Sequence, residues 1–135
     1  VRIGIPDFEG LDESPEILPG WQIPVFNYFK DLGVTAKYLY DYGDCWWHTV
    51  QLEGYFYKDK KLKYPICIDG ERACPPEACG GVQGYFELID TLSDPKNDGY
   101  EETRTWVGEK WHSDVFDKYA VKFDHPHKRW EKAFF

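Results

Sequence analysis

Methionine is absent from the 135-residue chain, even at position 1. A chain of 135 residues has the length of a single domain, and the absence of a starting methionine leads us to expect the C-terminal part of a slightly longer domain whose N-terminal segment is missing. The sequence also lacks any apolar run of about 18 residues, which argues against a membrane-spanning helix. No charged segment followed by a long apolar stretch opens the chain, so no secretory signal is visible.

Basic residues are few, with 16 Lys and Arg against 24 Asp and Glu and a net charge of −8. Because proteins that bind nucleic acid usually present a basic face to phosphates, the charge disfavours nucleic acid as a partner. Two local basic clusters keep nucleic acid possible: Lys58, Lys60, Lys61 and Lys63, and then Lys128, Arg129 and Lys132. A protein partner is also possible. Aromatic residues make up 19% of the chain, which is too many for a disordered segment.

The order of strand-like and helix-like patterns predicts an α+β fold. A small antiparallel sheet is expected, made of a hairpin at about 36–57, with Gly43-Asp44 as a two-residue turn, and a strand near 64–68. Three to four C-terminal helices should pack on it. The first ends at Asp94-Pro95 and the second is capped by Gly108. The others are predicted to begin near Ser113 and Asp124.

The stretch from Cys67 to Gly81 holds three cysteines, three glycines and the pair Pro75-Pro76, and Pro65 stands just before it. Pro75-Pro76 restricts the backbone and Gly80-Gly81 admits positive φ angles, so we expect a rigid loop that then turns sharply. Without a secretory signal, reduced thiols in the cytoplasm are the preferred interpretation.

Three thiolates and one imidazole form a common zinc shell, which makes zinc a candidate cofactor. The predicted ligands are Cys67, Cys74, Cys79 and His48, with Cys45 as another source of the fourth ligand. The cysteine spacing differs from the usual zinc knuckle, so buried thiols without metal, or a disulfide, are alternatives.

A second candidate cluster consists of Asp41, Asp44 and His48 on the predicted hairpin. With a two-residue turn, Asp41 and His48 share one face of the sheet, where a carboxylate can orient an imidazole for base chemistry or hold a metal ion. The alternative is that Asp44 shapes the turn and His48 has only a structural role. No phosphate-binding glycine loop and no Gly-x-Ser-x-Gly motif is present, so enzymatic activity is uncertain and not favoured.

Several motifs together resemble those of one family. These are Tyr40-Asp41-Tyr42-Gly43-Asp44, Tyr64-Pro65, Cys67-x-Asp69-Gly70-x-Arg72-Ala73-Cys74-Pro75-Pro76-Glu77-x-Cys79-Gly80-Gly81 and Trp106-Val107-Gly108. Over about residues 20–120 the chain resembles the root-inducing-plasmid open-reading-frame-three-like proteins. The resemblance implies a small prokaryotic α+β protein, in some cases carried on plasmids or mobile elements, and it implies no particular biochemical activity. Within the motifs, Asp41, Asp44 and Arg72 are further candidate site residues.

The chain departs from this family in places. Cys45, Ala78 and Gln83 stand where serine, aspartate and tryptophan are common, and an upstream portion usual in the family is expected to be missing. The leading hypothesis is a domain that acts by binding through the loop at Cys67–Gly81. The alternatives are a metal-dependent enzyme acting on nucleic acid, associated with recombination, and a structural zinc domain.

Overall fold

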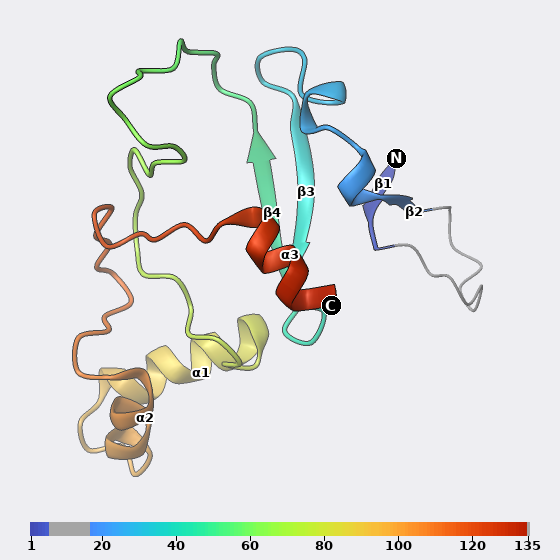
Figure 1. The fold of residues 1–135 in the computed structure, drawn as a ribbon. Helices are drawn as coiled ribbons and strands as arrows, with labels where there is room; N and C mark the ends of the chain where they lie inside the picture. The colour runs from blue at the N-terminus through green and yellow to red at the C-terminus, as the bar shows by residue number, and fades with distance from the viewer. Residues whose placement is uncertain (6–16, 135) are drawn as a thin grey trace. The chain divides into compact units, whose positions relative to one another are not determined.

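A computed structural model describes residues 1–5 and 17–134 of the chain (Figure 1). The described residues divide into two compact units, and the boundary between the units crosses a β-hairpin. Unit 1 comprises residues 1–39 and 47–56, and unit 2 comprises residues 40–46 and 57–135. The candidate site residues, apart from His48, belong to unit 2.

Unit 1 contains a short parallel strand pair in which β1 (Arg2–Gly4) pairs with β2 (Ile17–Pro19). Two 3-10 turns follow, η1 (Gly20–Gln22) and η2 (Val25–Asn27). Each turn is preceded by a proline with φ of −63°, at Pro19 and Pro24. Because the proline ring fixes φ near this value and removes the N–H donor, proline is well suited to the position just before such a turn.

The hairpin consists of β3 (Thr35–Tyr40) and β4 (Trp46–Gln51), which form a two-stranded sheet. The predicted two-residue turn at Gly43-Asp44 is wrong, because the strands leave five residues, 41–45, between them. Asp41 explains the longer loop: its Oδ1 accepts the backbone N–H groups of Gly43 at 2.9 Å and Asp44 at 3.2 Å. A side chain that captures backbone donors in this way competes with strand pairing.

Unit 2 contains the helices α1 (Gly81–Ser93), α2 (Tyr100–Val107) and α3 (Pro126–Phe134). The residue before a proline disfavours helical angles, and α1 accordingly ends at Asp94, whose backbone is extended. Gly108 ends α2 with φ of 85°, and its N–H donates to the carbonyl of Arg104 at 3.0 Å. The predicted ends of these two helices are therefore observed, and α1 packs against α2.

The predicted sheet with a third strand and three to four packed C-terminal helices is wrong. Residues 64–68 form bends and irregular backbone, since Pro65 has no N–H to give to a strand partner. The segment after Ser113 is a series of turns, in which Asp117 Oδ1 accepts the N–H of Tyr119 at 2.9 Å and so withdraws that donor from a helix. The described residues instead hold two separate two-stranded sheets and the three helices α1, α2 and α3.

Few side chains of the described residues are fully enclosed. Leu88 of α1 is the only buried hydrophobic side chain among them, with an exposed fraction of 5%. Large apolar side chains such as those of Phe56 and Tyr57 are instead open to solvent. None of the described helices combines the length and the apolar composition that crossing a bilayer requires.

Candidate binding site at the cysteine- and proline-rich loop

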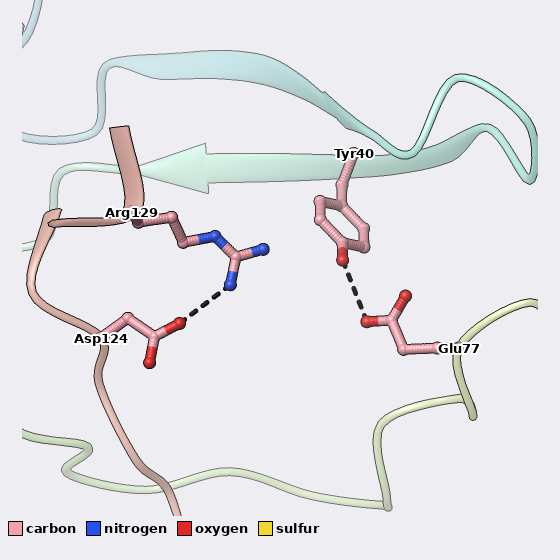
Figure 2. A network of polar contacts seen from close by, with 4 residues as sticks. All are labelled: Tyr40, Glu77, Asp124 and Arg129. Atoms are coloured by element: carbon pink, nitrogen blue, oxygen red, sulfur yellow. Dashed lines mark hydrogen bonds and ion pairs between the residues drawn. The ribbon is translucent and has the colours of Figure 1, made fainter. Parts of the chain in front are cut away.

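We call residues 67–81 the Cys/Pro loop. Its C-terminal end is held by the hairpin loop, because Asp44 Oδ2 accepts the N–H of Gly80 at 3.1 Å. The hydroxyl of Tyr40 donates to Glu77 Oε1 at 2.9 Å (Figure 2). At Gly81, with φ of 68°, a Cβ atom would lie 2.6 Å from the carbonyl oxygen of Asp44. Only glycine permits both this backbone angle and this approach.

The segment after α2 holds the middle of the Cys/Pro loop. The indole Nε1 of Trp111 donates to the carbonyl of Cys74 at 3.1 Å, and the N–H of Ala73 donates to the carbonyl of Ser113 at 3.0 Å. Arg104 of α2 in turn donates from Nη1 to the carbonyl of Trp111 at 2.8 Å. The loop is therefore hydrogen-bonded both to the hairpin end and to the segment that follows α2.

Tyr85 of α1 lies at the centre of an aromatic cluster that supports these contacts. Its ring makes edge-to-face contacts with Trp46, at 6.2 Å between centroids, and with Trp111, at 6.4 Å. Phe86 adds a tilted contact at 6.2 Å. Each such aromatic pair stabilises the folded chain by about 0.5–1.5 kcal/mol beyond the burial of apolar area. Through these contacts Tyr85 connects α1 to the start of β4 and to the segment that follows α2.

Backbone strain in the described structure is confined to the two loops at this site. Among the described residues, the non-glycine residues with positive φ are Asp41, Cys45, Arg72 and Ala78, with angles between 56° and 64°. Such residues cost about 1–3 kcal/mol each and persist only where the surrounding structure enforces them. They gather at functional sites, and here all four lie in the hairpin loop or the Cys/Pro loop.

All four cysteines are free thiols. Cys67 and Cys79 are partly buried, whereas Cys45 and Cys74 are exposed. Burial raises the pKa of the Cys79 thiol, and the carboxylate of Asp44 raises it further. A helix N-terminus ordinarily favours a thiolate, but at Cys79 these two effects outweigh that influence.

No group of three or more His, Cys, Asp or Glu side chains in the described part of the chain is arranged to hold a metal ion. His48 belongs to unit 1, and the other predicted ligands belong to unit 2. Asp41 and Asp44 bind backbone N–H groups, and the ring of His48 lies 5.6 Å from that of Tyr38. Zinc on Cys67, Cys74, Cys79 and His48 stays a prediction. About one zinc per chain, with thiols that react only after chelation, would establish a metal site, and substitution of each cysteine and of His48 would then identify its ligands.

Sequence reasoning missed several residues that shape this site. Tyr40 and Glu77 stand inside the family-like motifs, but nothing in their spacing indicates that they are bonded to each other. Trp111 belongs to none of those motifs, and its contacts depend on the fold. Beside Tyr40, the guanidinium of Arg129 binds Asp124 Oδ2 at 2.8 Å, which raises the pKa of Arg129 (Figure 2).

Comparison with known proteins extends the resemblance to the start of the chain. The family model described as "Plasmid pRiA4b ORF-3-like protein" matches residues 1–120, so the match is not limited to about residues 20–120. The "Uncharacterized protein y4hQ" of Sinorhizobium fredii is 32% identical over 129 residues, which are 95% of this chain and 62% of that protein.

A solved structure agrees with the same assignment. The crystal structure of a "Protein of Unknown Function", MM3350 from Methanosarcina mazei Go1, is 35% identical and superposes with a TM-score of 0.71. The superposition covers 79% of this chain and 60% of that one. The chain thus spans about three fifths of the length of each relative. On the family match and these two relatives, the chain belongs to the plasmid pRiA4b ORF-3-like protein family.

Proposed function

We propose that this chain is a binding domain whose site is the Cys/Pro loop and whose partner is another protein. The observation that carries the proposal is a loop whose residues 73–80 are hydrogen-bonded to the segment after α2 and to the hairpin, while the residues just before them, 68–72, are exposed to solvent. Ile68 is 75% exposed, and Arg72 is exposed and has no hydrogen-bond or ion-pair partner among the described residues. Glu71 lies exposed between them in sequence.

A fixed loop supports binding because association then orders little new backbone. Loops that are ordered only on binding lose part of the interaction energy to that ordering. Here the bonds from Asp44, Trp111 and Ser113 hold residues 73–80 of the loop, which directly follow Arg72, before any partner arrives. The strain at Arg72, with φ of 64°, is consistent with a side chain held in a set direction for recognition.

The exposed side chains favour a protein partner over a small ligand. Arginine is enriched among the residues that dominate protein interfaces, and a neighbouring aliphatic side chain supplies apolar area. A small molecule is usually bound in a concave pocket that encloses most of its surface. Ile68 and Arg72 are instead exposed on a loop, as a protein contact requires.

The enzymatic alternative receives less support from the same residues. A metal-dependent enzyme acting on nucleic acid needs Asp41, Asp44 and His48 around one ion. In the described structure the two carboxylates accept backbone N–H groups and hold the hairpin loop and Gly80 in place. These are structural roles, so binding through the Cys/Pro loop is the function we put forward.

A site-specific cross-linking experiment tests the proposal. A photoreactive benzoylphenylalanine replaces Ile68 in one variant and Val25 in a control variant, since Val25 is 69% exposed but lies in unit 1. We expect a discrete cross-linked protein from position 68 that position 25 does not give. The same products from both positions, or none from position 68, would refute the proposal.

The cross-linked protein, once identified and purified, permits a quantitative check. Arg72→Glu should weaken its binding about thirtyfold or more, because loss of a central interface arginine costs about 2 kcal/mol or more. Lys30→Glu is the matched control, with the same charge change at an exposed residue of unit 1. Circular dichroism verifies that both variants remain folded. Equal weakening by both would show that net charge, and not the loop, governs binding.

A further inference from the structure

Residues 57–64, here called the lysine loop, concentrate positive charge in an acidic protein. Four of the eight residues are lysines and one is an aspartate, whereas the whole chain has a net charge of −8. Every residue of the lysine loop is exposed. The loop lies wholly within unit 2 and outside the Cys/Pro loop, so a role for it does not depend on the proposed protein partner.

The lysine loop is a defined turn closed by its single acidic residue. Asp59 Oδ1 accepts the N–H of Lys61 at 2.8 Å, and the carbonyl of Asp59 accepts the N–H of Leu62 at 3.2 Å. The N–H of Asp59 donates to the hydroxyl of Tyr64 at 3.2 Å. The carboxylate is thus used inside the turn, while all four lysines of the loop are exposed.

An aromatic side chain stands at each end of the lysine loop. Tyr57 is fully exposed, with an exposed fraction of 103%, so both faces of its ring are open to a ligand. Tyr64 is 41% exposed, and Lys58 Nζ lies 5.7 Å from the centroid of its ring. Lysines that can contact phosphates, together with an open aromatic ring on which a base can stack, are the elements used to bind single-stranded nucleic acid.

We propose that the lysine loop is a binding site for single-stranded nucleic acid. In this arrangement the ring of Tyr57 stacks on a base, and Lys60, Lys61 and Lys63 contact the neighbouring phosphates. Base stacking does not require a particular sequence, because every base has an aromatic face. Duplex bases are already stacked on one another, so the site should prefer single strands.

An anionic membrane is the main competing occupant, and the charge distribution disfavours it. A bilayer is a broad anionic surface, and the chain as a whole carries a net charge of −8, so a bilayer repels much of the protein while it attracts the lysine loop. A single strand is narrow and flexible, and presents far fewer anionic groups to the rest of the chain. Local positive charge on an acidic protein therefore suits a strand better than a surface.

Fluorescence anisotropy with a labelled thymidine oligonucleotide of about 12 nucleotides tests the proposal. Tyr57→Ala should weaken binding by about fivefold or more, whereas Tyr57→Phe, which keeps the ring, should stay within about twofold of the parent. Tyr119→Ala is the matched control: Tyr119 is 87% exposed and has Lys118 Nζ at 5.3 Å from its ring, but lies elsewhere in unit 2. It should leave binding unchanged.

The dependence on salt tests the role of the lysines. In single strands each neutralised phosphate contributes about 0.7 to the slope of log affinity against log salt concentration. Replacing Lys60 and Lys61 by glutamine should therefore reduce the magnitude of that slope by about 1.4. The control replaces Lys128 and Lys132 by glutamine, removing the same charge from α3, and should leave the slope unchanged.

Three results would overturn the proposal. The first is equal binding of a duplex of the same length, and the second is equal weakening by Tyr57→Ala and Tyr119→Ala. The third is capture by phosphatidylserine vesicles with no binding of the oligonucleotide, which would assign the loop to membranes. Because Tyr57 is fully exposed, its substitution removes no packing contact, and circular dichroism should be unchanged in every variant.

Discussion

The hydroxyl of Tyr40 donates a hydrogen bond of 2.9 Å to Glu77 Oε1, joining residues that are 37 positions apart in the chain (Figure 2). Tyr40 is the last residue of β3, and Glu77 follows Pro75-Pro76 in the Cys/Pro loop. Three residues further along the loop, Gly80 donates to Asp44 of the hairpin loop. These two bonds together set the path of the chain into α1.

The pKa of Tyr40 should report directly on the Tyr40–Glu77 bond. Hydrogen bonding to Glu77, together with its negative charge, raises the pKa of Tyr40 above the ordinary tyrosine value. The bond needs the protonated phenol, so its contribution to folding is present below the unfolded tyrosine pKa of about 10 and is lost as pH rises through the folded pKa. Glu77→Gln should lower the pKa of Tyr40.

Ring signals of labelled tyrosines, followed by NMR as pH rises, measure this change, and Tyr40→Phe assigns the signal. Glu71→Gln is the control, since it removes one carboxylate from the same loop without touching Tyr40. A Tyr40 pKa that is unchanged in Glu77→Gln, or equally lowered in Glu71→Gln, would show that the bond does not govern the titration.

The adjacent glycines Gly80 and Gly81 should differ sharply in their tolerance of alanine. Both have positive φ, 87° and 68°, so alanine at either position costs about 1–2 kcal/mol in backbone strain. At Gly80 the nearest atom to an added Cβ is 3.5 Å away, which is an ordinary contact, whereas at Gly81 the Asp44 carbonyl oxygen is at 2.6 Å. Gly81→Ala should therefore cost about 1–3 kcal/mol more than Gly80→Ala.

Urea denaturation of the two variants and the parent measures this difference, with Gly80→Ala acting as the control for backbone strain alone. If the two substitutions lower the free energy of unfolding equally, the hairpin loop does not approach the start of α1 as closely as the structure has it. The comparison thus tests a contact between segments distant in sequence.

The positive φ angles at Gly80-Gly81 and the ends of α1 and α2 were predictable because each depends on a local rule. Glycine admits positive φ, a proline ends the preceding helix and a glycine caps one, whatever the rest of the chain does. The length of the hairpin turn was not predicted correctly. The pair Gly43-Asp44 indicates a two-residue turn, but the Asp41 carboxylate captures two backbone donors and lengthens the loop to five residues.

The remaining contacts of the candidate site depend on tertiary structure and leave no mark in the local pattern. Trp111 could be recognised as apolar but not as the donor to Cys74, which is 37 positions away. The strand expected near 64–68 failed for a related reason, since β-prone residues form a strand only when a partner strand is available. Around Pro65 the described structure provides none.

Trp111→Phe should destabilise unit 2 because phenylalanine keeps an aromatic ring but loses the indole donor to Cys74. A hydrogen bond of this kind contributes about 1 kcal/mol, and the edge-to-face contact with Tyr85 is also weakened. Trp106→Phe is the matched control, because Trp106 of α2 is 53% exposed and should change stability by less than about 0.5 kcal/mol. If urea denaturation shows the same loss of unfolding free energy in both variants, the indole of Trp111 does not stabilise the Cys/Pro loop.

The thiol of Cys79 should be the slowest of the four to react with iodoacetamide near pH 8. Burial and the Asp44 carboxylate raise its pKa, and the thiolate is the reactive form. The protonated thiol is favoured in the folded state, so its contribution to stability is present below the unfolded thiol pKa and is lost as pH rises through the higher folded value. Mass spectrometry of the alkylated peptides gives the rate at each cysteine.

Asp44→Asn separates the two causes of the raised pKa, because asparagine keeps an acceptor for Gly80 but removes the charge. Alkylation of Cys79 should become about two- to threefold faster, and burial should keep it slower than at the exposed Cys45 and Cys74. Asp69→Asn is the control, since it removes a carboxylate from the same loop that has no part in the Cys79 shift. A Cys79 that reacts fastest in the parent chain would mean that this thiol is neither buried nor near Asp44. The hairpin loop would then not lie against the start of α1, and the fixed Cys/Pro loop on which the binding proposal depends would lose one of its two supports.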